Sequence, residues 1–256
     1  MPHASHSRNL PTTPPVRIGC AGWGLPTKIA SQFPAPGSHL ERYAQIFSSV
    51  EINSSFYRPD LPKTYARWAA SVPDAFRFSV KIPRTISHEL RLKDADAAVR
   101  KFMLEITSLG EKLGCLLLQL PPSFALDVTM AQDFFSLLRD FTSAHIICEP
   151  RHVSWFSEEG AKAMQDAGVA CVRAHPAPVP GVEPAGDADT LYIRLHGSPK
   201  IYYSAYDEPF IEAVAGRIVE ARSSNVEVWC IFDNTALGEA VANAMSLMDE
   251  LKKMDN

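Results

Sequence analysis

From Val16 onward, hydrophobic and polar positions follow two alternating patterns along the chain. Short apolar or alternating runs are typical of strands, and they are separated by segments whose apolar residues recur at helical spacing. The strand-like runs are VRIGC, SVEINSSF, FRFSVKI, CLLLQL, HIICE, VACVR, TLYIRLH and VEVWCIFD. This alternation predicts a parallel sheet, and eight units favour a single-domain α/β TIM barrel, the (β/α)8 fold, over an open doubly wound sheet. The glycines around Trp23 do not form the GxGxxG loop that such an open sheet would normally carry.

About seven helices are expected between the strands. The first begins with a capping box at Ser38 and Glu41, and another begins near Asp207. The other expected helices are near 63–70, 95–113, after 129, 157–167 and 237–251. The segment after VACVR is rich in proline and has no helical period, so no helix is expected there.

The alternation within each strand predicts which side chains point into the barrel. In the third run, Phe78 and Val80 share one face while Ser79 and Lys81 share the other. If the apolar face meets the helices, the second face fills the interior and becomes polar where each strand ends. Six strands then direct polar side chains to one mouth, namely Glu51, Asn53, Lys81, Gln119, Glu149, Arg194, His196 and Asp233. Barrel active sites lie at this end of the strands.

Composition narrows the class of protein without naming a reaction. The 256 residues are 46% hydrophobic and 21% charged, which predicts one barrel domain over 16–256 after a flexible tail over 1–15. A net charge of −4 argues against a general nucleic-acid surface, and no apolar stretch is long enough for a membrane span. Five scattered cysteines in apolar surroundings are typical of free thiols in a reducing compartment, so a cytoplasmic location is expected. The sequence carries no signal for an oligomeric state.

Several long segments of this chain resemble those of one known family. They are VEINSSFYR, FRFSVKIPRTISHEL, LGCLLLQLPPSF, EPRHVSWF, LYIRLHG and FDN, and they resemble domain-of-unknown-function family 72, the YecE-like barrel proteins, over about Val16–Leu251. The resemblance implies the barrel fold but no particular reaction. The chain departs from the family pattern at Ala21, where a hydroxyl residue is usual, and at His175, near a position that is often acidic.

The candidate catalytic residues are Glu51, Glu149, His196 and Lys81. The two glutamates could act as a pair in acid–base chemistry or glycosidic hydrolysis, or they could simply neutralise the neighbouring cations. Lys81 could form a Schiff base if burial depresses its pKa, or it could serve as a salt-bridge partner or anion anchor. The sequence leaves these alternatives open.

Candidate substrate-binding residues cluster after the strands. Arg and His recur after three of them, which indicates a site for phosphate or carboxylate. Aromatic side chains there could stack on a sugar or base, and amide and carboxylate groups complete the set. The full set is Trp23, Asn53, Tyr57, Arg84, His88, Gln119, Arg151, His152, Arg194, Tyr206, Asp233 and Asn234.

No organic cofactor is expected at this mouth. A divalent metal held by Glu51, Glu149, His196 and Asp233 is a weaker alternative, because no HxH or HExxH motif supports it and adjacent cations compete. The sequence therefore favours an enzyme of hydrolase or isomerase type that acts on a small anionic or polyhydroxylated substrate. The alternative is a non-catalytic barrel that binds a small anion.

Overall fold

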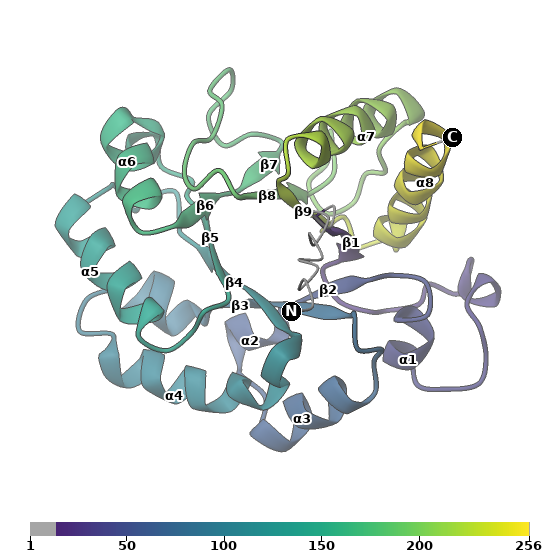
Figure 1. The fold of residues 1–256 in the computed structure, drawn as a ribbon, viewed down its shortest axis with the longest axis horizontal. Coiled ribbons are helices and arrows are strands. Elements are labelled where there is room, and N and C mark those ends of the chain that lie inside the picture. The colour runs from purple at the N-terminus through teal and green to yellow at the C-terminus, as the bar shows by residue number, and fades with distance from the viewer. Residues whose placement is uncertain (1–13, 256) are drawn as a thin grey trace, which may run out of the picture.

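The computed structural model describes residues 14–255, so nearly all of the expected tail over 1–15 lies outside the described residues. Within that range nine parallel strands form a ring with the helices outside it (Figure 1). The strands are β1 (Val16–Cys20), β2 (Ser49–Ile52), β3 (Arg77–Lys81), β4 (Leu113–Gln119), β5 (His145–Glu149), β6 (Val169–Cys171), β7 (Arg173–His175), β8 (Thr190–Leu195) and β9 (Glu227–Phe232). All eight expected strands are present, and the sixth is split into β6 and β7 at Val172.

The ring is TIM-barrel-like, but its hydrogen-bonded ladders form two sheets rather than one closed barrel. One sheet has the order β1-β9-β8-β7 and the other β2-β3-β4-β5-β6. The seam at β6 and β7 arises because β6 pairs with β5 while β7 pairs with β8. At the other seam, β1 and β2 are joined by an isolated bridge between Ala21 and Glu51. Gly19 permits this close approach, since a Cβ there would lie 2.1 Å from the Ser49 carbonyl oxygen.

The seven expected helices are present in the predicted order, and a further short helix over 54–57 occupies the end of the run SVEINSSF, which the pattern assigns to a strand. The helices are α1 (His39–Tyr43), α2 (Ser54–Tyr57), α3 (Pro62–Ala70), α4 (Asp96–Ile106), α5 (Val128–Arg139), α6 (Glu158–Asp166), α7 (Glu208–Ser223) and α8 (Glu239–Met254). The capping box at Ser38 is present, and the Asp207 side chain caps α7. The described chain has no helix between β7 and β8, as the proline-rich segment predicted.

The predicted alternation of faces is confirmed by two separate hydrophobic clusters. Leu116, Leu118 and Ile146 belong to the large cluster between strands and helices. Leu117 and Ile147, one residue away from them, belong to a small cluster inside the ring together with Tyr192 and Trp229. The interior is thus filled with side chains, and its polar end lies where the strands finish.

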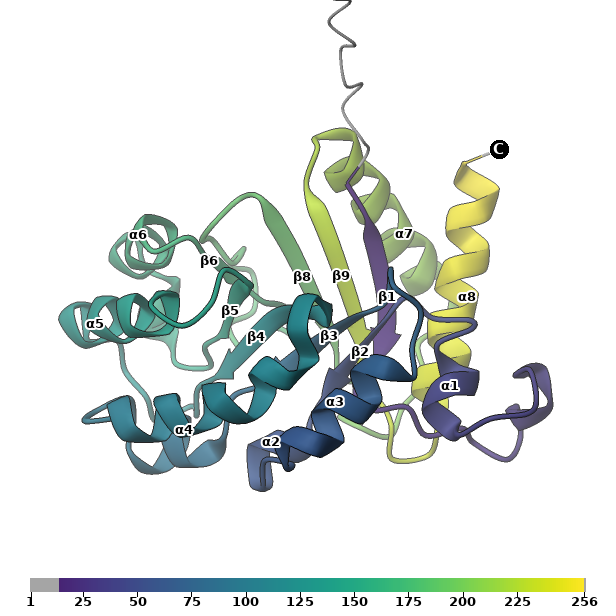
Figure 2. The ribbon, with the colours of Figure 1, turned by 60° about the horizontal axis from the view of Figure 1, so that its bottom comes forward.

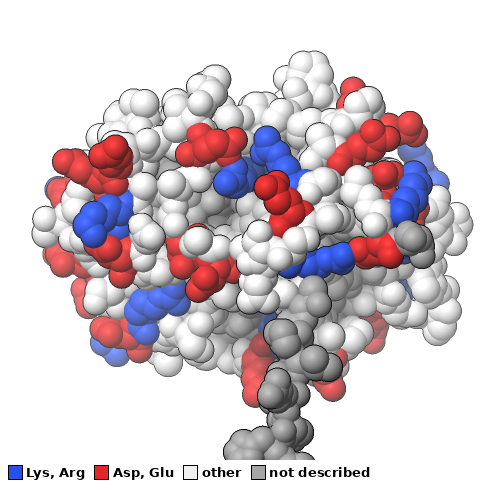
Figure 3. Space-filling view, turned by 45° about the horizontal axis from the view of Figure 1, so that its top comes forward, with Lys and Arg blue, Asp and Glu red and all other residues white. Residues whose placement is uncertain are grey.

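All strands run in the same direction, so their carboxyl ends meet at one end of the ring (Figure 2). On the face shown in Figure 3, basic and acidic side chains are interspersed rather than gathered by sign. Across the described residues no helix is both long and apolar enough to cross a membrane.

Candidate functional site

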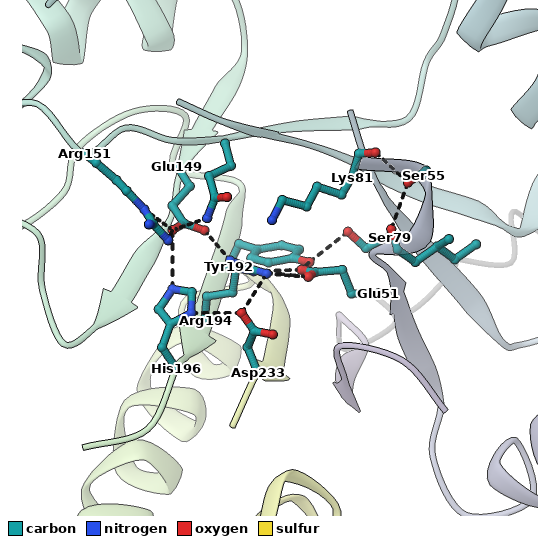
Figure 4. Close-up of polar contacts among 12 residues, drawn as sticks. Glu51, Ser55, Ser79, Lys81, Glu149, Arg151, Tyr192, Arg194, His196 and Asp233 are labelled. Carbon is teal, nitrogen blue, oxygen red and sulfur yellow. Dashed lines mark hydrogen bonds and ion pairs between the residues drawn. The ribbon is translucent and has the colours of Figure 1, made fainter. Parts of the chain in front are cut away.

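Arg194 of β8 is the centre of a buried ion network at the carboxyl end of the ring (Figure 4). Its Nη2 lies 2.6 Å from Oε1 of Glu51 and 3.1 Å from Oδ2 of Asp233. Its Nη1 lies 2.7 Å from Oε2 of Glu149. The guanidinium thus joins carboxylates from β2, β5 and the end of β9, and it is fully buried.

Glu51 is held by further bonds from inside the ring. Its Oε2 accepts from Nε of Arg194 at 2.9 Å and from the Tyr192 hydroxyl at 2.9 Å. The same hydroxyl lies 2.8 Å from Oγ of Ser79, which serves as the donor in this pair because the phenol has a single proton. Tyr192 and Ser79 were not among the predicted site residues, although their inward positions were.

Glu149 likewise accepts hydrogen bonds at both carboxylate oxygens. Its Oε1 accepts from Nε2 of Gln119 at 3.0 Å and from Nη2 of Arg151 at 3.0 Å, while Oε2 accepts from Arg194. Burial by itself would raise the pKa of Glu149, but the charge of Arg194, followed by His196 and Arg151, holds it well below its ordinary value. Glu149 is therefore an anion at neutral pH and is not a proton donor.

His196 connects two of these carboxylates. Its Nδ1 lies 3.0 Å from Oδ2 of Asp233. Its Nε2 lies 3.3 Å from Oε1 of Glu149, close enough for charge attraction but without hydrogen-bond geometry, so this buried nitrogen has no hydrogen-bond partner among the described residues. Burial lowers the pKa of His196, yet the bond to Asp233 and the proximity of Glu149 raise it overall. Asp233 shows the converse, because Arg194 and His196 outweigh burial and lower its pKa.

Lys81 at the end of β3 differs from the other charged groups at this mouth. Its side chain extends toward the network without a contact to it (Figure 4). Its Nζ lies 4.3 Å from the centroid of the Phe56 ring, and no ion pair with a carboxylate is formed within residues 14–255. Burial lowers the pKa of Lys81 to about 8, and the nearby charge of Arg194 acts in the same direction. Only 8% of the residue is exposed.

A second set of cations surrounds the mouth. The side chain of Arg151 is 31% exposed beyond its contact with Glu149. His88, on a short π-helical turn over Thr85–Glu89, packs edge-on against Phe56. Burial lowers the pKa of His88, and so do the charges of Lys81, Arg84 and Arg151. Arg84 is half exposed and pairs with Glu89.

The segment after β8 folds over His196. Tyr202 meets the His196 ring edge-on, with the centroids 5.9 Å apart. Burial lowers the pKa of Arg151, but Glu149 and, to a smaller extent, the Tyr202 hydroxyl raise it overall. Gly197 has a φ of 96°, and a Cβ there would lie 2.8 Å from the Ser204 carbonyl oxygen. Tyr202 is thus a mouth residue missing from the predicted set, whose only signal was its place in the loop after the strand.

Two predicted substrate contacts instead hold this segment in place. The Asn234 amide donates to the Ser204 carbonyl oxygen at 3.0 Å and to Asn243 of α8 at 2.9 Å. The Tyr206 hydroxyl donates to the His175 carbonyl oxygen at 3.0 Å and accepts from the Gly197 amide at 2.8 Å. The sequence placed both side chains beside the substrate because they follow strands. In the structure the polar groups of both side chains contact backbone atoms or α8, and a substrate contact for either stays a prediction.

The remaining predicted residues lie around the network rather than in it. Trp23 packs against Trp68, and Tyr57 is largely exposed beside Phe56. His152 bonds to Ser154 and caps a short helical turn. Asn53 begins α2, and its side-chain oxygen is buried without a partner among the described atoms. The two departures from the family pattern, Ala21 and His175, lie at the β1–β2 seam and against Tyr206.

Within residues 14–255 no group of three or more His, Cys, Asp or Glu side chains is arranged to hold a metal ion. The carboxylates proposed for such a site face Arg194 instead. A cavity of about 940 Å³ lies elsewhere, outside the ring between α7 and the segment that replaces a helix before β8. Its lining includes Arg173, Ile193 and Phe210, whose side chains belong to the outer face. The candidate site is therefore identified by its chemistry and not by this cavity.

The fold and this network define a TIM-barrel-like protein with a charged site at its strand ends. A family model described as "Protein of unknown function DUF72" matches residues 17–256, and the chain belongs to that family. UPF0759 protein YunF of Bacillus subtilis is 25% identical over 92% of this chain and 94% of its own length. UPF0759 protein YecE of Escherichia coli K12 is 34% identical over 109 residues, which span 43% of this chain and 39% of YecE.

Solved structures agree with the family assignment. The crystal structure of a DUF72 family protein from Thermotoga maritima has a TM-score of 0.77 and 26% identity, covering 93% of this chain and 98% of that one. A DUF72 family protein from Enterococcus faecalis has a TM-score of 0.76 at 21% identity, covering 93% and 95%. These matches establish the fold, and the family assignment rests on the family model over residues 17–256.

Proposed function

We propose that this chain is an enzyme that binds a small anionic substrate at the carboxyl end of the ring, with Lys81 and Arg151 facing the anion. One observation carries the proposal. Lys81 is a nearly buried cation that lies over an aromatic ring, with no carboxylate partner in the described chain. A buried ammonium without a counter-ion is costly, and a bound anion would remove that cost.

The surroundings of Lys81 favour an anion over a neutral ligand. The carboxylates of Glu51, Glu149 and Asp233 form ion pairs with Arg194. They also favour the charged form of Lys81 from a greater distance, but burial and the charge of Arg194 outweigh them and lower its pKa. The side chain of Arg151 remains partly exposed, and Arg84 lies half exposed at the rim beside Glu89. In this proposal Arg194 organises the site, and the sequence-based idea that it grips the substrate is set aside.

His196 supports a catalytic role rather than simple carriage. Burial lowers its pKa, but the bond to Asp233 and the proximity of Glu149 raise it overall and favour the imidazolium. Its buried Nε2 lies 3.3 Å from Oε1 of Glu149 and makes no hydrogen bond among the described atoms. Such a group can donate a proton or a hydrogen bond to a substrate oxygen. An isomerase-type proton transfer fits this pairing of a protonated His196 with Lys81, whose lowered pKa leaves part of its population neutral.

Hydrolysis by two carboxylates is less well supported. That mechanism needs one carboxylic acid with a raised pKa, whereas the pKa of Glu149 is lowered and Glu51 is bonded to Arg194 and Tyr192.

A cytoplasmic location is part of the proposal, since the cysteines are all buried free thiols.

Titration calorimetry with inorganic phosphate at constant ionic strength tests the binding step. We expect one phosphate to bind the wild type and Lys81→Met to weaken binding about tenfold, which corresponds to about 1.4 kcal/mol. Arg77→Gln is a matched control, because Arg77 begins the same strand that Lys81 ends. Equal affinity in wild type and Lys81→Met, or no binding by the wild type, overturns the proposal.

Proton exchange separates catalysis from carriage. Dihydroxyacetone phosphate combines a phosphate with protons next to a ketone, and its exchange in D2O can be followed by proton NMR. We expect the wild type to accelerate exchange and His196→Asn to lose most of that acceleration while still binding phosphate. Binding without accelerated exchange would instead favour the non-catalytic barrel that binds a small anion.

A further inference from the structure

The Lys81 amine lies in surroundings that favour a nucleophile as well as a charge. Lysines at sites of pure charge pairing contact carboxylates, as Lys162 contacts Asp166 on the surface of α6. The Lys81 amine instead lies against the Phe56 ring, at the end of an inward strand position. Burial and the nearby charge of Arg194 outweigh the carboxylates of the network and lower the pKa of Lys81, so its neutral amine is more populated than that of an ordinary lysine.

We propose that Lys81 forms an imine with an anionic aldehyde or ketone, so that the substrate class of this site is a small carbonyl compound bearing carboxylate or phosphate. This inference rests on the proposed function, because the same mouth must first bind the anion. The neutral Nζ of Lys81 attacks the carbonyl carbon, and the C–N bond forms while the carbonyl π electrons move to oxygen. The resulting carbinolamine then loses its hydroxyl as water, leaving the C=N bond of the imine.

In this proposal His196 assists the loss of water. Its Nε2 has no hydrogen-bond partner among the atoms described, and its Nδ1 is fixed by Asp233. One of the two protons of the attacking nitrogen passes to the alkoxide and gives the carbinolamine hydroxyl. A proton from Nε2 then leaves with this hydroxyl as water, so His196 becomes neutral and the nitrogen, which keeps its second proton, becomes a protonated imine. The positive charge of the protonated imine makes the adjacent C–H acidic, which is the step that an isomerase-type reaction requires.

Arg151 supplies the matching contact for the substrate anion. Its planar guanidinium remains 31% exposed while it bonds to Glu149, and Tyr202 lies beside it. A guanidinium binds carboxylate or phosphate through two parallel bonds. In this proposal the anionic group of the carbonyl compound contacts Arg151 while its carbonyl carbon meets the Lys81 amine.

Reductive trapping with glyoxylate tests the imine directly. Glyoxylate condenses with an amine, and cyanoborohydride delivers hydride to the imine carbon, leaving a carboxymethyl group that peptide mass spectrometry maps to a residue. We expect Lys81 to be labelled first at limiting glyoxylate, with a rate that rises through about pH 8, the pKa of Lys81. Inorganic phosphate should slow this labelling by occupying the same mouth.

Two variants keep the test independent of folding and of anion binding. Lys81→Arg retains the charge but lacks an amine that forms an imine, so we expect phosphate binding to persist while labelling at position 81 disappears. Lys112 is a matched control, because it is also mostly buried but its Nζ donates to the Val72 carbonyl oxygen. We expect Lys112→Arg to leave the pattern unchanged.

The outcomes separate this inference from the proposed function. If label spreads over surface lysines and spares Lys81 while the wild type still binds phosphate, the imine is overturned and the anion site stands. If the wild type binds no phosphate and Lys81 reacts no faster than surface lysines, both proposals fail. Fast labelling of Lys81 that phosphate slows supports the imine.

Discussion

Arg194 and Glu51 form a two-point ion pair in the interior of the ring, with both side chains fully excluded from solvent. The Nη2–Oε1 distance is 2.6 Å and the Nε–Oε2 distance is 2.9 Å. The pair joins β8 to β2, which lie in different sheets. The network thus links the two sheets across the interior, and the guanidinium of Arg194 directs its donors at carboxylates of the protein itself.

Removing Arg194 should therefore strongly destabilise the protein. Arg194→Met leaves three carboxylates buried around a neutral side chain, and breaking such a network costs about 3–5 kcal/mol. Urea unfolding monitored by circular dichroism measures the loss. Arg222→Met, which breaks the exposed contact with Asp255, is the control and should change the midpoint little. Equal midpoints for the two variants would contradict a structural role for the network.

His196 should make stability depend on pH on the alkaline side. Its pKa is raised above the ordinary value of 6.5, so its bonds to Asp233 stabilise the fold fully below pH 6.5. That contribution is lost as pH rises through the folded-state pKa and the imidazolium deprotonates. The difference in unfolding free energy between wild type and His196→Asn should shrink above pH 6.5. A difference that stays constant to pH 10 would show that His196 is neutral in the fold.

Glu227 should produce the opposite dependence at the other end of the ring. It accepts from Arg17 at 3.1 Å and from the Trp229 indole at 3.0 Å. Burial opposes the shift, but His145 and Arg17 lower its pKa from 4.5 to about 2. Its contribution is present above pH 4.5 and is lost as the pH falls toward 2. Thermal unfolding should show the advantage of wild type over Glu227→Gln fading across that interval, and an advantage that persists at pH 2 would refute the assignment.

The β1–β2 seam should be sensitive to a single methyl group. Gly19→Ala places a Cβ 2.1 Å from the Ser49 carbonyl oxygen, so the strands must separate. In Gly216→Ala on α7 the added Cβ meets nothing within 4 Å. Because glycine destabilises a helix interior relative to alanine, this change should raise the free energy of unfolding by up to about 1 kcal/mol. Melting temperatures should fall for the first variant and rise slightly for the second. A tolerated Gly19→Ala would mean that the seam is not closely packed.

The strand pattern predicted the fold and the residues that meet at the mouth, because alternation along a strand determines which face each side chain occupies. It therefore predicted correctly that five residues lie close together, namely Glu51, Glu149, Arg194, His196 and Asp233. The split of the sixth strand at Val172 was not predictable, since VACVR reads as one run while its halves pair with different neighbours.

The partners within the site were harder to predict than its location. The sequence offered Arg194 as an anion clamp, but its donors are directed at three carboxylates. Tyr206 and Asn234 follow strands, and their side chains nevertheless turn to hold the loop. The pattern assigns Phe56 to the end of the strand-like run SVEINSSF, whereas it lies on the short helix α2, where its ring contacts the Lys81 amine.

A crystal structure with phosphate at a concentration that saturates the calorimetric titration tests the central claim most directly. The account predicts tetrahedral density within hydrogen-bond distance of Lys81 Nζ, with a second contact to Arg151. Density confined to other positions, such as the outer cavity beside Arg173, with none at Lys81, would contradict it.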